Sequence, residues 1–372
     1  MARAREIIEP RRYRARMTAV QRATLLIALA LMSCEADRPK APPSATASNR
    51  AATGPAPAKL SAEDDAPRYA APRRTVAVGD LHGDLAATKS VLRAAGAIDD
   101  KDAWIGGDLV VVQTGDQLDR GDDERAIIDL LDRLAEEAKK AGGALHVLNG
   151  NHEIMNVALD FRYVTEGGFK DFNDVPGANL SDPKLQHLPA NARARGAAFL
   201  PGSPYARRMA KRHLSVVVGD TVFVHGGVLP KHVRYGLGKM EKQVRAWMEG
   251  AAPSPPSIVT SEDGPVWVRR YSAAPEKQDC TILSEALDGL SAKRMVVGHT
   301  VQRGGISPGC DQKVWRIDCG LAAHYGGPSE ALEIIGDQVR VIRGGAHAPH
   351  ASDGGPAGSA APGGSGAPRR DP

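Results

Sequence analysis

An aspartate and a histidine, Asp80 and His82, follow a short apolar run at a place where both side chains are hard to bury. The stretch is VAVGDLHGDL, residues 76–85, in which three apolar residues lead into a glycine. Gly and Asp commonly end strands, because Gly adopts positive φ and Asp hydrogen-bonds to its own backbone. Alternatively, a carboxylate and an imidazole held at the end of a strand can bind a metal ion. Taken alone, the stretch does not choose between a turn and a metal site.

Four further apolar runs end in polar residues of the same kinds. They lead into GDQLDRG (115–121), GNHE (150–153), HGG (225–227) and GHT (298–300). Turn chemistry explains the Gly, Asn and Asp residues, but it does not explain a histidine in four of the five motifs. The histidines are His82, His152, His225 and His299. Ligand sites in open α/β sheets lie at the carboxyl ends of strands. We therefore expect these strand ends to form the walls of a metal site.

The apolar runs themselves predict buried β-strands. They are rich in β-branched residues and continuous rather than alternating, a pattern typical of a sheet covered on both faces. The runs are TVAVG (75–79), LVVVQT (109–114), ALHVL (144–148), LSVVV (214–218), TVFVH (221–225) and RMVVG (294–298). Between the second and third runs, apolar residues recur at helical spacing until Gly142 ends the helix. Strand, helix and strand in this order predict an α/β layered fold with a right-handed crossover.

In this order, the five motifs resemble those of the calcineurin-like metallophosphoesterases, within the phosphoprotein phosphatase superfamily. Four further stretches, GGFKDF, GPVWVRRY, AKRMVVGHTVQ and VWRIDCGLAAHYGG, resemble the bacterial branch called Shewanella-like phosphatases. The resemblance implies one α/β domain, a layered β-sandwich flanked by helices. After GNHE the chain reads IMNVALDFRYV, which departs from the eukaryotic serine/threonine phosphatases, and their C-terminal motif is absent. Their substrate preference is therefore not transferred to this chain.

The resemblance also implies two divalent metal ions (Mn, Fe or Zn) held by oxygen and imidazole ligands. The implied ligands are Asp80, His82 and Asp116 at one ion, and Asn151, His225 and His299 at the other, with Asp116 bridging the two. Asn151 contributes an oxygen without charge, so the dications are only partly neutralised and attract a phosphate. Two ions about 3.5–4 Å apart can hold a bridging hydroxide for in-line attack on phosphorus.

The same resemblance assigns catalytic and phosphate-binding side chains. His152 directly follows a ligand and so faces the same cleft, which suits a general acid for the leaving group. Asp119 resembles the carboxylate that orients this histidine. Arg120, inside GDQLDRG, presents a planar fork that matches two phosphate oxygens.

Four other residues near the motifs receive weaker assignments. Arg269 in WVRRY is a candidate for a second phosphate clamp, with Arg270 as its rival and a structural role open for either. Glu153 is expected to orient the turn or a ligand rather than to react. Asp84 is expected to support the site or to cap a helix, because aspartate is favoured at helix starts.

The beginning of the chain predicts export. Six arginines within residues 1–16 precede ATLLIALALM (23–32), which is too short to span a bilayer and has the length of a signal-peptide core. LMSC (31–34) resembles the lipobox of bacterial lipoproteins, in which the cysteine, here Cys34, is acylated after cleavage. A plain membrane anchor or an uncleaved signal is the alternative, and Met17 could also be the start. We expect a lipoprotein anchored to a membrane on the periplasmic side or in the cell envelope.

Composition divides the rest of the chain. Residues 35–73, rich in Ala, Pro, Ser and charge, predict a disordered linker, and residues 344–372 predict a disordered Gly/Pro/Ala-rich tail. The folded domain is expected over residues 74–343. It holds Cys280, Cys310 and Cys319. Cys310 and Cys319 could close a hairpin by a disulfide in an exported protein, but buried free thiols are equally compatible with the sequence.

Together these features predict a membrane-tethered, metal-dependent phosphomonoesterase that acts on phosphorylated protein or peptide, without choosing between phosphotyrosine and phosphoserine/threonine. The rivals are a small-molecule phosphatase or nucleotide pyrophosphohydrolase of the same fold, and an inactive lipoprotein that binds phosphorylated ligands. The 372 residues carry a formal net charge of only +4, with 42% hydrophobic residues, as in ordinary soluble domains. Because the domain lacks a basic stripe, nucleic acid is not an expected partner. No partner chain is inferred.

Overall fold

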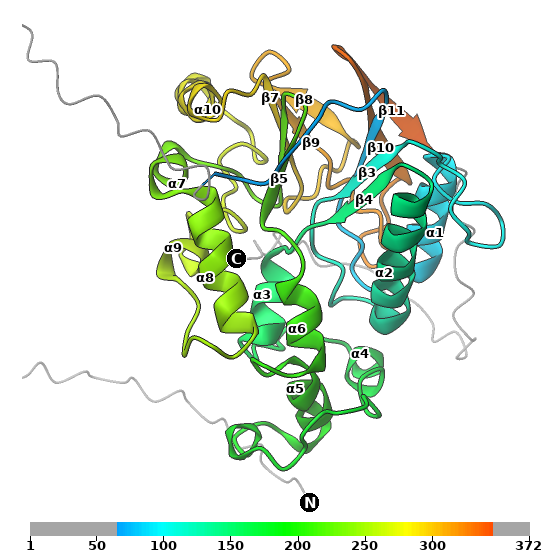
Figure 1. Cartoon of the computed structure of the whole chain (residues 1–372), viewed down its shortest axis with the longest axis vertical. Helices are drawn as coiled ribbons and strands as arrows, with labels where there is room; N and C mark the ends of the chain where they lie inside the picture. The colour runs from blue at the N-terminus through cyan, green and yellow to red at the C-terminus, as the bar shows by residue number, and fades with distance from the viewer. Residues whose placement is uncertain (1–64, 345–372) are drawn as a thin grey trace, which may run out of the picture. The chain divides into compact units, whose positions relative to one another are not determined.

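Two β-sheets form the centre of the domain (Figure 1). The computed structural model describes residues 65–344. The five-stranded sheet has the order β11-β10-β2-β3-β4, with β2 (Thr75–Val78), β3 (Val110–Gln113), β4 (Ala144–Val147), β10 (Glu330–Ile335) and β11 (Gln338–Arg343). The six-stranded sheet has the order β1-β5-β6-β7-β9-β8, with β1 (Arg68–Tyr69), β5 (Ser215–Val218), β6 (Thr221–Val224), β7 (Arg294–Val297), β8 (Ser307–Gly309) and β9 (Val314–Arg316). The predicted layered α/β architecture in a single domain is confirmed.

Two sets of parallel strands determine where the loops gather. β2, β3 and β4 are parallel, with Val76 opposite Val111 and Val111 opposite Leu145. β6, β7 and β9 are parallel in the other sheet. Parallel strands end at the same edge of a sheet, so the loops that follow β2, β3, β6, β7 and β9 can converge on one site.

Strands of the six-stranded sheet are buried on both faces. Val216, Phe223 and Val296 pack in the core between the sheets, whereas Val217 and Val222 pack in a second core beneath helices. Successive side chains of a strand point to opposite faces, so burial on both faces requires apolar residues at consecutive positions. This arrangement explains the continuous apolar runs of the sequence.

Helices cover the outer faces of both sheets. α1 (Leu85–Ala94) and α2 (Glu124–Lys140) pack on the five-stranded sheet, and α2 confirms the helix predicted to end at Gly142. The second core takes apolar residues from α7 (Pro230–Tyr235), α8 (Leu237–Met248), α9 (Ser257–Thr260) and α10 (Lys277–Gly289). Figure 1 shows α1 and α2 on one flank of the sheets and α7, α8 and α10 on the other.

A further group of helices follows α3 (Asn151–Val157), in a region for which the sequence predicted no element. Residues 159–212, called the helical lobe below, contain α4 (Glu166–Lys170), η2 (Pro183–Leu185), η3 (Ala190–Ala192), α5 (Arg193–Phe199) and α6 (Pro204–Ala210). Leu185, Leu188, Ala192 and Ala197 form a small core of their own in this lobe. In Figure 1, α4 and α5 lie below the sheets.

Several predictions for the ends of the chain fall outside the described residues. They concern the export signal over residues 1–34 with Cys34, most of the linker, and nearly all of the tail. Residues 65–73, assigned to the linker by composition, are ordered: β1 pairs in parallel with β5, and Ala66 is 4% exposed. The folded part begins earlier than composition indicates, because backbone pairing does not require large apolar side chains. Within residues 65–344, every helix is too short or too polar to cross a membrane.

The disulfide differs from the pairing considered from the sequence. Cys280 in α10 is bonded to Cys310 in the turn between β8 and β9, with Cα atoms 5.2 Å apart. Cys319 is a buried free thiol, and its Sγ lies 3.1 Å from the carbonyl oxygen of Pro328. The hairpin pairing of Cys310 with Cys319 is therefore wrong. The actual pair depends on α10 lying beside the β8–β9 turn, which the spacing of cysteines does not reveal.

Candidate metal centre

The six expected metal ligands meet where the strands end. Asp80 and His82 follow β2, Asp116 follows β3, Asn151 begins α3 just after β4, and His225 and His299 follow β6 and β7. None of the six residues is more than 7% exposed. The carboxylates, the amide and the imidazoles that the motifs predicted are thus buried together.

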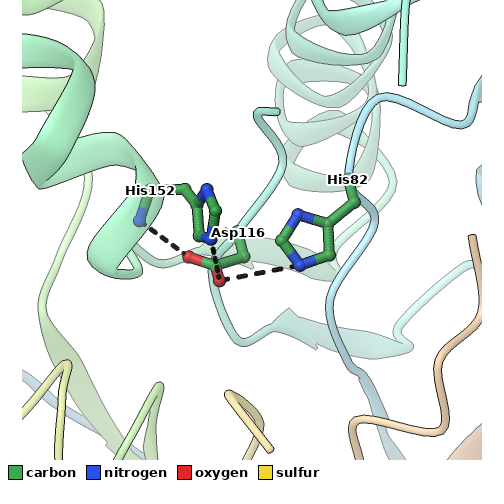
Figure 2. A group of neighbouring side chains, drawn as sticks. All are labelled: His82, Asp116 and His152. Carbon is green, nitrogen blue, oxygen red and sulfur yellow. Dashed lines mark hydrogen bonds and ion pairs between the residues drawn. The ribbon is translucent and has the colours of Figure 1, made fainter. Parts of the chain in front are cut away.

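One donor group surrounds Asp116 and His82. Nε2 of His82 lies 3.8 Å from Oδ2 of Asp116 and 3.9 Å from Oδ2 of Asp80. Figure 2 shows the Asp116 carboxylate between the rings of His82 and His152. Metal–ligand bonds of about 2.0–2.2 Å place neighbouring ligand atoms roughly 3–4 Å apart around one ion. The spacing of this group suits a metal ion.

A second donor group surrounds Nε2 of His225. This nitrogen lies 3.2 Å from Oδ2 of Asp116, 2.9 Å from Oδ1 of Asn151 and 3.2 Å from Nδ1 of His299. Asp116, His225 and His299 together offer ligand atoms within 4.8 Å of one another. Asp116 therefore belongs to both donor groups.

Backbone acceptors orient two of the imidazoles. Nδ1 of His82 donates to the carbonyl oxygen of Leu118 at 3.0 Å, and Nδ1 of His225 donates to that of Thr114 at 3.0 Å. The proton on Nδ1 leaves the lone pair on Nε2, which is the nitrogen that faces the carboxylates. Such outer hydrogen bonds are typical of metal-binding histidines.

Two glycines of the motifs make room for the carboxylates. A Cβ on Gly150 would lie 2.1 Å from Oδ1 of Asp116, and a Cβ on Gly298 would lie 2.4 Å from Oδ1 of Asp80. Any side chain at these positions would displace a ligand. The glycines of GNHE and GHT are thus explained by close approach as well as by turn geometry.

Backbone strain concentrates at the same place. Among the described residues, eleven non-glycine residues have positive φ, and five of them lie at this site. The five are His82 (45°), Asp116 (58°), Asp119 (67°), Arg120 (71°) and His299 (67°). Left-handed conformations of such residues are uncommon and cluster at functional sites. The strain indicates that side-chain placement here outweighs backbone preference.

The site holds more buried negative charge than its neighbours neutralise. Burial raises the pKa of Asp80 well above its usual range, and the charges of Asp318 and Asp116 raise it further. Burial also raises the pKa of Asp318 to about 6. Carboxylates crowded in this way are costly without a cation. Bound cations would remove this cost, so the residues present fit divalent metal ions.

His82 and His152 differ in protonation. Burial and the charge of His152 lower the pKa of His82 to about 3, so its imidazole is neutral and able to bind a metal. Burial lowers the pKa of His152 as well. The charge of Asp116, together with the hydrogen bond and the charge of Asp119, outweighs this effect and raises the pKa of His152 to about 9. The two neighbouring carboxylates thus favour the protonated form of His152.

The expected pair of His152 and Asp119 is present. Nδ1 of His152 donates to Oδ2 of Asp119 at 2.5 Å, and Asp119 is fully buried. Nε2 of His152 faces the cleft, 3.7 Å from Oδ2 of Asp116. With His82 and Asp116, His152 also forms a group that could hold a metal ion.

A cleft of about 560 Å³ opens onto this centre. Arg120 lines it, and the guanidinium of Arg120 lies 4.1 Å from the ring centroid of Tyr163. Arg269 lines it too, and its Nη1 donates to the carbonyl oxygen of His299 at 2.9 Å and to Oγ1 of Thr300 at 3.1 Å. Arg270 instead forms an ion pair with Asp279. Of the two rival arginines, Arg269 is the one that reaches the cleft.

The two supporting carboxylates lie where the sequence suggested. Glu153 accepts hydrogen bonds from the backbone N–H groups of Asp116 (2.8 Å), Gln117 (2.9 Å) and Gly150 (2.7 Å). It thus holds the turn that carries a ligand. Asp84 caps α1, and its Oδ1 accepts from the N–H of Ala87 at 2.9 Å.

The sequence analysis missed several residues of the site. Asp318, 2% exposed, follows β9 and lines the cleft. It repeats the pattern of a polar residue at a strand end, which was therefore available as a signal. Three aromatic rings also line the cleft, each beside a histidine: Tyr163 beside His152, Tyr325 beside His82 and Trp267 beside His299. Arg195, in the helical lobe, contacts Asp119 and had no sequence signal at all.

The fold and the centre define a class of enzyme. A family model described as calcineurin-like phosphoesterase matches residues 73–303, and the chain belongs to this family. It is accordingly a metallophosphoesterase, a hydrolase of phosphate esters, from a family that uses divalent metal ions.

Similar proteins support a narrower placement. Shewanella-like protein phosphatase 2 of Arabidopsis thaliana is 40% identical over 307 residues, which cover 74% of this chain and 78% of that protein. Shewanella-like protein phosphatase 1 of Plasmodium berghei is 29% identical over 281 residues, covering 73% and 74%. A solved cold-active protein tyrosine phosphatase has the same fold, with a TM-score of 0.61 at 24% identity, covering 76% of this chain and 80% of that one. The resemblance to the Shewanella-like phosphatases is confirmed.

Proposed function

We propose that this enzyme uses two divalent metal ions to hydrolyse phosphate monoesters on proteins. The observation that carries the proposal is the position of Asp116, whose Oδ2 lies 3.8 Å from Nε2 of His82 and 3.2 Å from Nε2 of His225. A carboxylate oxygen placed between two donor groups can bridge two cations. Oxygen and imidazole donors without thiolates suit Mn, Fe or Zn.

The six ligands divide between two sites that share Asp116. Asp80, His82 and Asp116 would hold one ion, and Asp116, Asn151, His225 and His299 would hold the other. Ions bound there would stabilise charge on the phosphoryl oxygens and lower the pKa of a water molecule that serves as nucleophile.

The remaining polar residues of the cleft handle the phosphate and the leaving group. Arg120 and Arg269 bind phosphoryl oxygens from the wall of the cleft, since a guanidinium fork matches two of these oxygens. His152 donates the proton on Nε2 to the leaving oxygen. Asp119 holds Nδ1 of His152, which fixes the ring so that Nε2 faces the cleft.

Two observations support a phosphoprotein substrate. The relatives compared above are named protein phosphatases. The cleft is also walled by Tyr163, Trp267 and Tyr325, and such rings pack well against an aromatic leaving group. Phosphotyrosine is therefore the side chain that we expect to be hydrolysed fastest.

The test combines metal analysis with a substrate panel. We expect purified enzyme to contain divalent metal and to release phosphate from phosphopeptides, with phosphotyrosine ahead of phosphoserine and phosphothreonine. Faster turnover of dinucleoside polyphosphates or small phosphate esters than of any phosphopeptide would favour the small-molecule rival. Binding of phosphopeptides without hydrolysis, whichever metal is supplied, would contradict the catalytic proposal.

We also propose that the protein is exported and anchored through a lipid on Cys34. The lipobox-like LMSC supports this, and so does the Cys280–Cys310 disulfide, since disulfides persist mainly in oxidising compartments. Cys34→Ala should move the protein from the membrane fraction to the soluble fraction. Continued sedimentation of this variant with membranes would contradict anchoring by lipid.

A further inference from the structure

Arg195 is a fully buried arginine that connects the helical lobe to the centre. It lies in α5 and is 0% exposed. Its Nη2 donates at 3.2 Å to Oδ1 of Asp119, the carboxylate oxygen that does not contact His152. Among residues 65–344, those that line the cleft do not include Arg195, so it acts on the site only through other residues.

A second donor holds the same oxygen of Asp119. Nδ2 of Asn156 donates to Oδ1 of Asp119 at 3.0 Å, and Nε of Arg195 donates to Oδ1 of Asn156 at 2.8 Å. The guanidinium therefore contacts Asp119 both directly and through Asn156. With Oδ1 held by two donors, Oδ2 is the oxygen left to face Nδ1 of His152.

Arg195 also serves a second buried carboxylate. Its Nη1 forms an ion pair with Glu124, and Oε1 of Glu124 accepts from the backbone N–H of Asp119 at 2.7 Å. Burial raises the pKa of Glu124 to about 7, and Arg195 opposes this rise. One arginine thus compensates two carboxylates that would otherwise repel each other beside His152.

The surroundings of Arg195 are apolar on the other side. The centre of its guanidinium lies 4.7 Å from the ring centroid of Phe172, 5.2 Å from that of Phe199 and 5.9 Å from that of Phe161. Each aromatic face attracts the cation, and together the rings shield it from water. If the guanidinium were removed, solvent would have little room to replace it.

We propose that Arg195 is a positioning residue for the general acid, holding Asp119 so that His152 presents its proton to the leaving group. The inference deepens the proposed function and rests on it. Through this residue, which itself touches neither substrate nor metal, the helical lobe contributes to the chemical step. The simpler alternative is that Arg195 only stabilises the fold.

The two explanations predict different dependence on the leaving group. A general acid matters most when the leaving oxygen is a poor leaving group, whereas a folding defect affects all substrates alike. The experiment measures kcat for aryl phosphates from p-nitrophenyl phosphate (good leaving group) to phenyl phosphate (poor), together with metal content and Tm. We expect Arg195→Met to lower kcat roughly 10–100-fold for phenyl phosphate and at most about threefold for p-nitrophenyl phosphate, with metal content unchanged.

Three variants make the comparison decisive. His152→Asn provides the reference slope for loss of the acid. Arg212→Met is the matched control, because Arg212 is also a buried arginine of the helical lobe but contacts Gln117 and Asp132 instead of the pair. It should lower activity equally for every leaving group. Arg195→Met combined with His152→Asn should lose no more activity on phenyl phosphate than His152→Asn alone, because residues acting as a unit are not additive.

Equal loss of kcat across the series, or full additivity with His152→Asn, would overturn the inference while leaving the proposed function intact. If Arg195→Met does not fold, Arg195→Lys decides: the charge remains but the fork is lost, so an intermediate leaving-group dependence supports the inference and a wild-type dependence refutes it. If wild-type enzyme and His152→Asn show the same dependence on the leaving group, the proposed function fails first.

Discussion

The strand-end loops and the helical lobe contribute different groups to one centre. The loops after the parallel strands carry all six proposed ligands, most of the negative charge, and five residues with positive φ. The helical lobe carries none of the ligands but contributes Arg195 behind the acid pair and Tyr163 beside Arg120. In the proposed function the metal ligands come from the strand-end loops, whereas Arg195 and Tyr163, which support the acid pair and Arg120, come from the helical lobe.

Rigidity gives a physical reason for this division. Ligand atoms must stay within a few tenths of an ångström of their positions, and strand ends are fixed by the hydrogen bonds of a whole sheet. The lobe has a small core of its own and joins the second core through residues such as Phe172 and Phe199, so side-chain packing rather than a sheet fixes it. If this comparison is correct, replacing a proposed ligand in the loops should cost more activity than any substitution in the lobe.

The largest effect is expected for Asp116→Asn. The change removes the charge from the oxygen that both donor groups share, so both ions should bind less tightly. We expect kcat/KM to fall by at least about 10³-fold, more than the loss usually caused by removing one transition-state hydrogen-bond donor. Measurement of kcat/KM with saturating Mn²⁺, together with bound metal, checks the prediction.

Asp318→Asn is the matched control for this prediction. Asp318 is buried, lines the cleft and raises the pKa of nearby Asp80. It belongs neither to the donor group around His82 nor to the one around His225. Its replacement should reduce activity far less than Asp116→Asn. Undiminished activity of Asp116→Asn, or an equal loss in both variants, would break the assignment of Asp116 as the bridging ligand.

A smaller effect is expected for the two arginines of the cleft. Arg120 comes from a strand-end loop but rests on the lobe, since its N–H donates to the carbonyl oxygen of Tyr163 at 3.1 Å and its guanidinium stacks on that ring. Arg120→Lys loses the fork and the stacking, so kcat/KM should fall roughly tenfold, as for a hydrogen bond to a charged group. Arg269→Lys, at an exposed site, should cost about threefold or less.

Inhibition by inorganic phosphate distinguishes the two arginines further. Arg120→Lys should weaken phosphate binding more than Arg269→Lys does. Tyr163→Leu, which leaves the Arg120 fork but removes its aromatic support, should lie between them. The reverse order for the two lysine variants would make Arg269 the principal clamp and would reduce the role of the lobe in phosphate recognition.

The division between loops and lobe also explains what the sequence could predict. Each proposed ligand follows an apolar run within a few residues, so a local pattern predicted Asp80, Asn151 and His299 to lie at one site without knowledge of the fold. Asp318 obeys the same rule, but β9, the strand before it, has only three residues and pairs antiparallel with β8 as well as parallel with β7. Arg195 obeys no local rule: its role comes from the contact of α5 with Asp119, 76 residues earlier in the chain.

Two other features were beyond the sequence for the same reason. β1 is formed by backbone pairing with β5, and composition carries no signal for such pairing. The Cys280–Cys310 disulfide depends on where α10 lies relative to the β8–β9 turn. Long-range contacts between elements decide both, whereas the strands, α2 and the ligand motifs are encoded over short stretches.

The smallest effect on activity is expected from the disulfide, which lies outside both regions compared here. It closes a loop with a sequence separation of 30 residues, and a crosslink of this span stabilises a fold by about 3–4 kcal/mol in the chain-entropy model. It also holds a turn in which Cys310, Asp311 and Gln312 all have positive φ, a conformation that opposes folding of this turn.

Cys280→Ser combined with Cys310→Ser should therefore lower Tm by roughly 6–14 °C. Activity at 25 °C should stay within about twofold of wild type, because both cysteines lie outside the donor groups and the acid pair. Thermal unfolding of wild type with and without reductant, beside the double serine variant, makes the comparison, and the variant itself should not respond to reductant. A loss of kcat as large as that of Arg195→Met would show that a third region controls the chemistry, and the contrast between loops and lobe would then be incomplete.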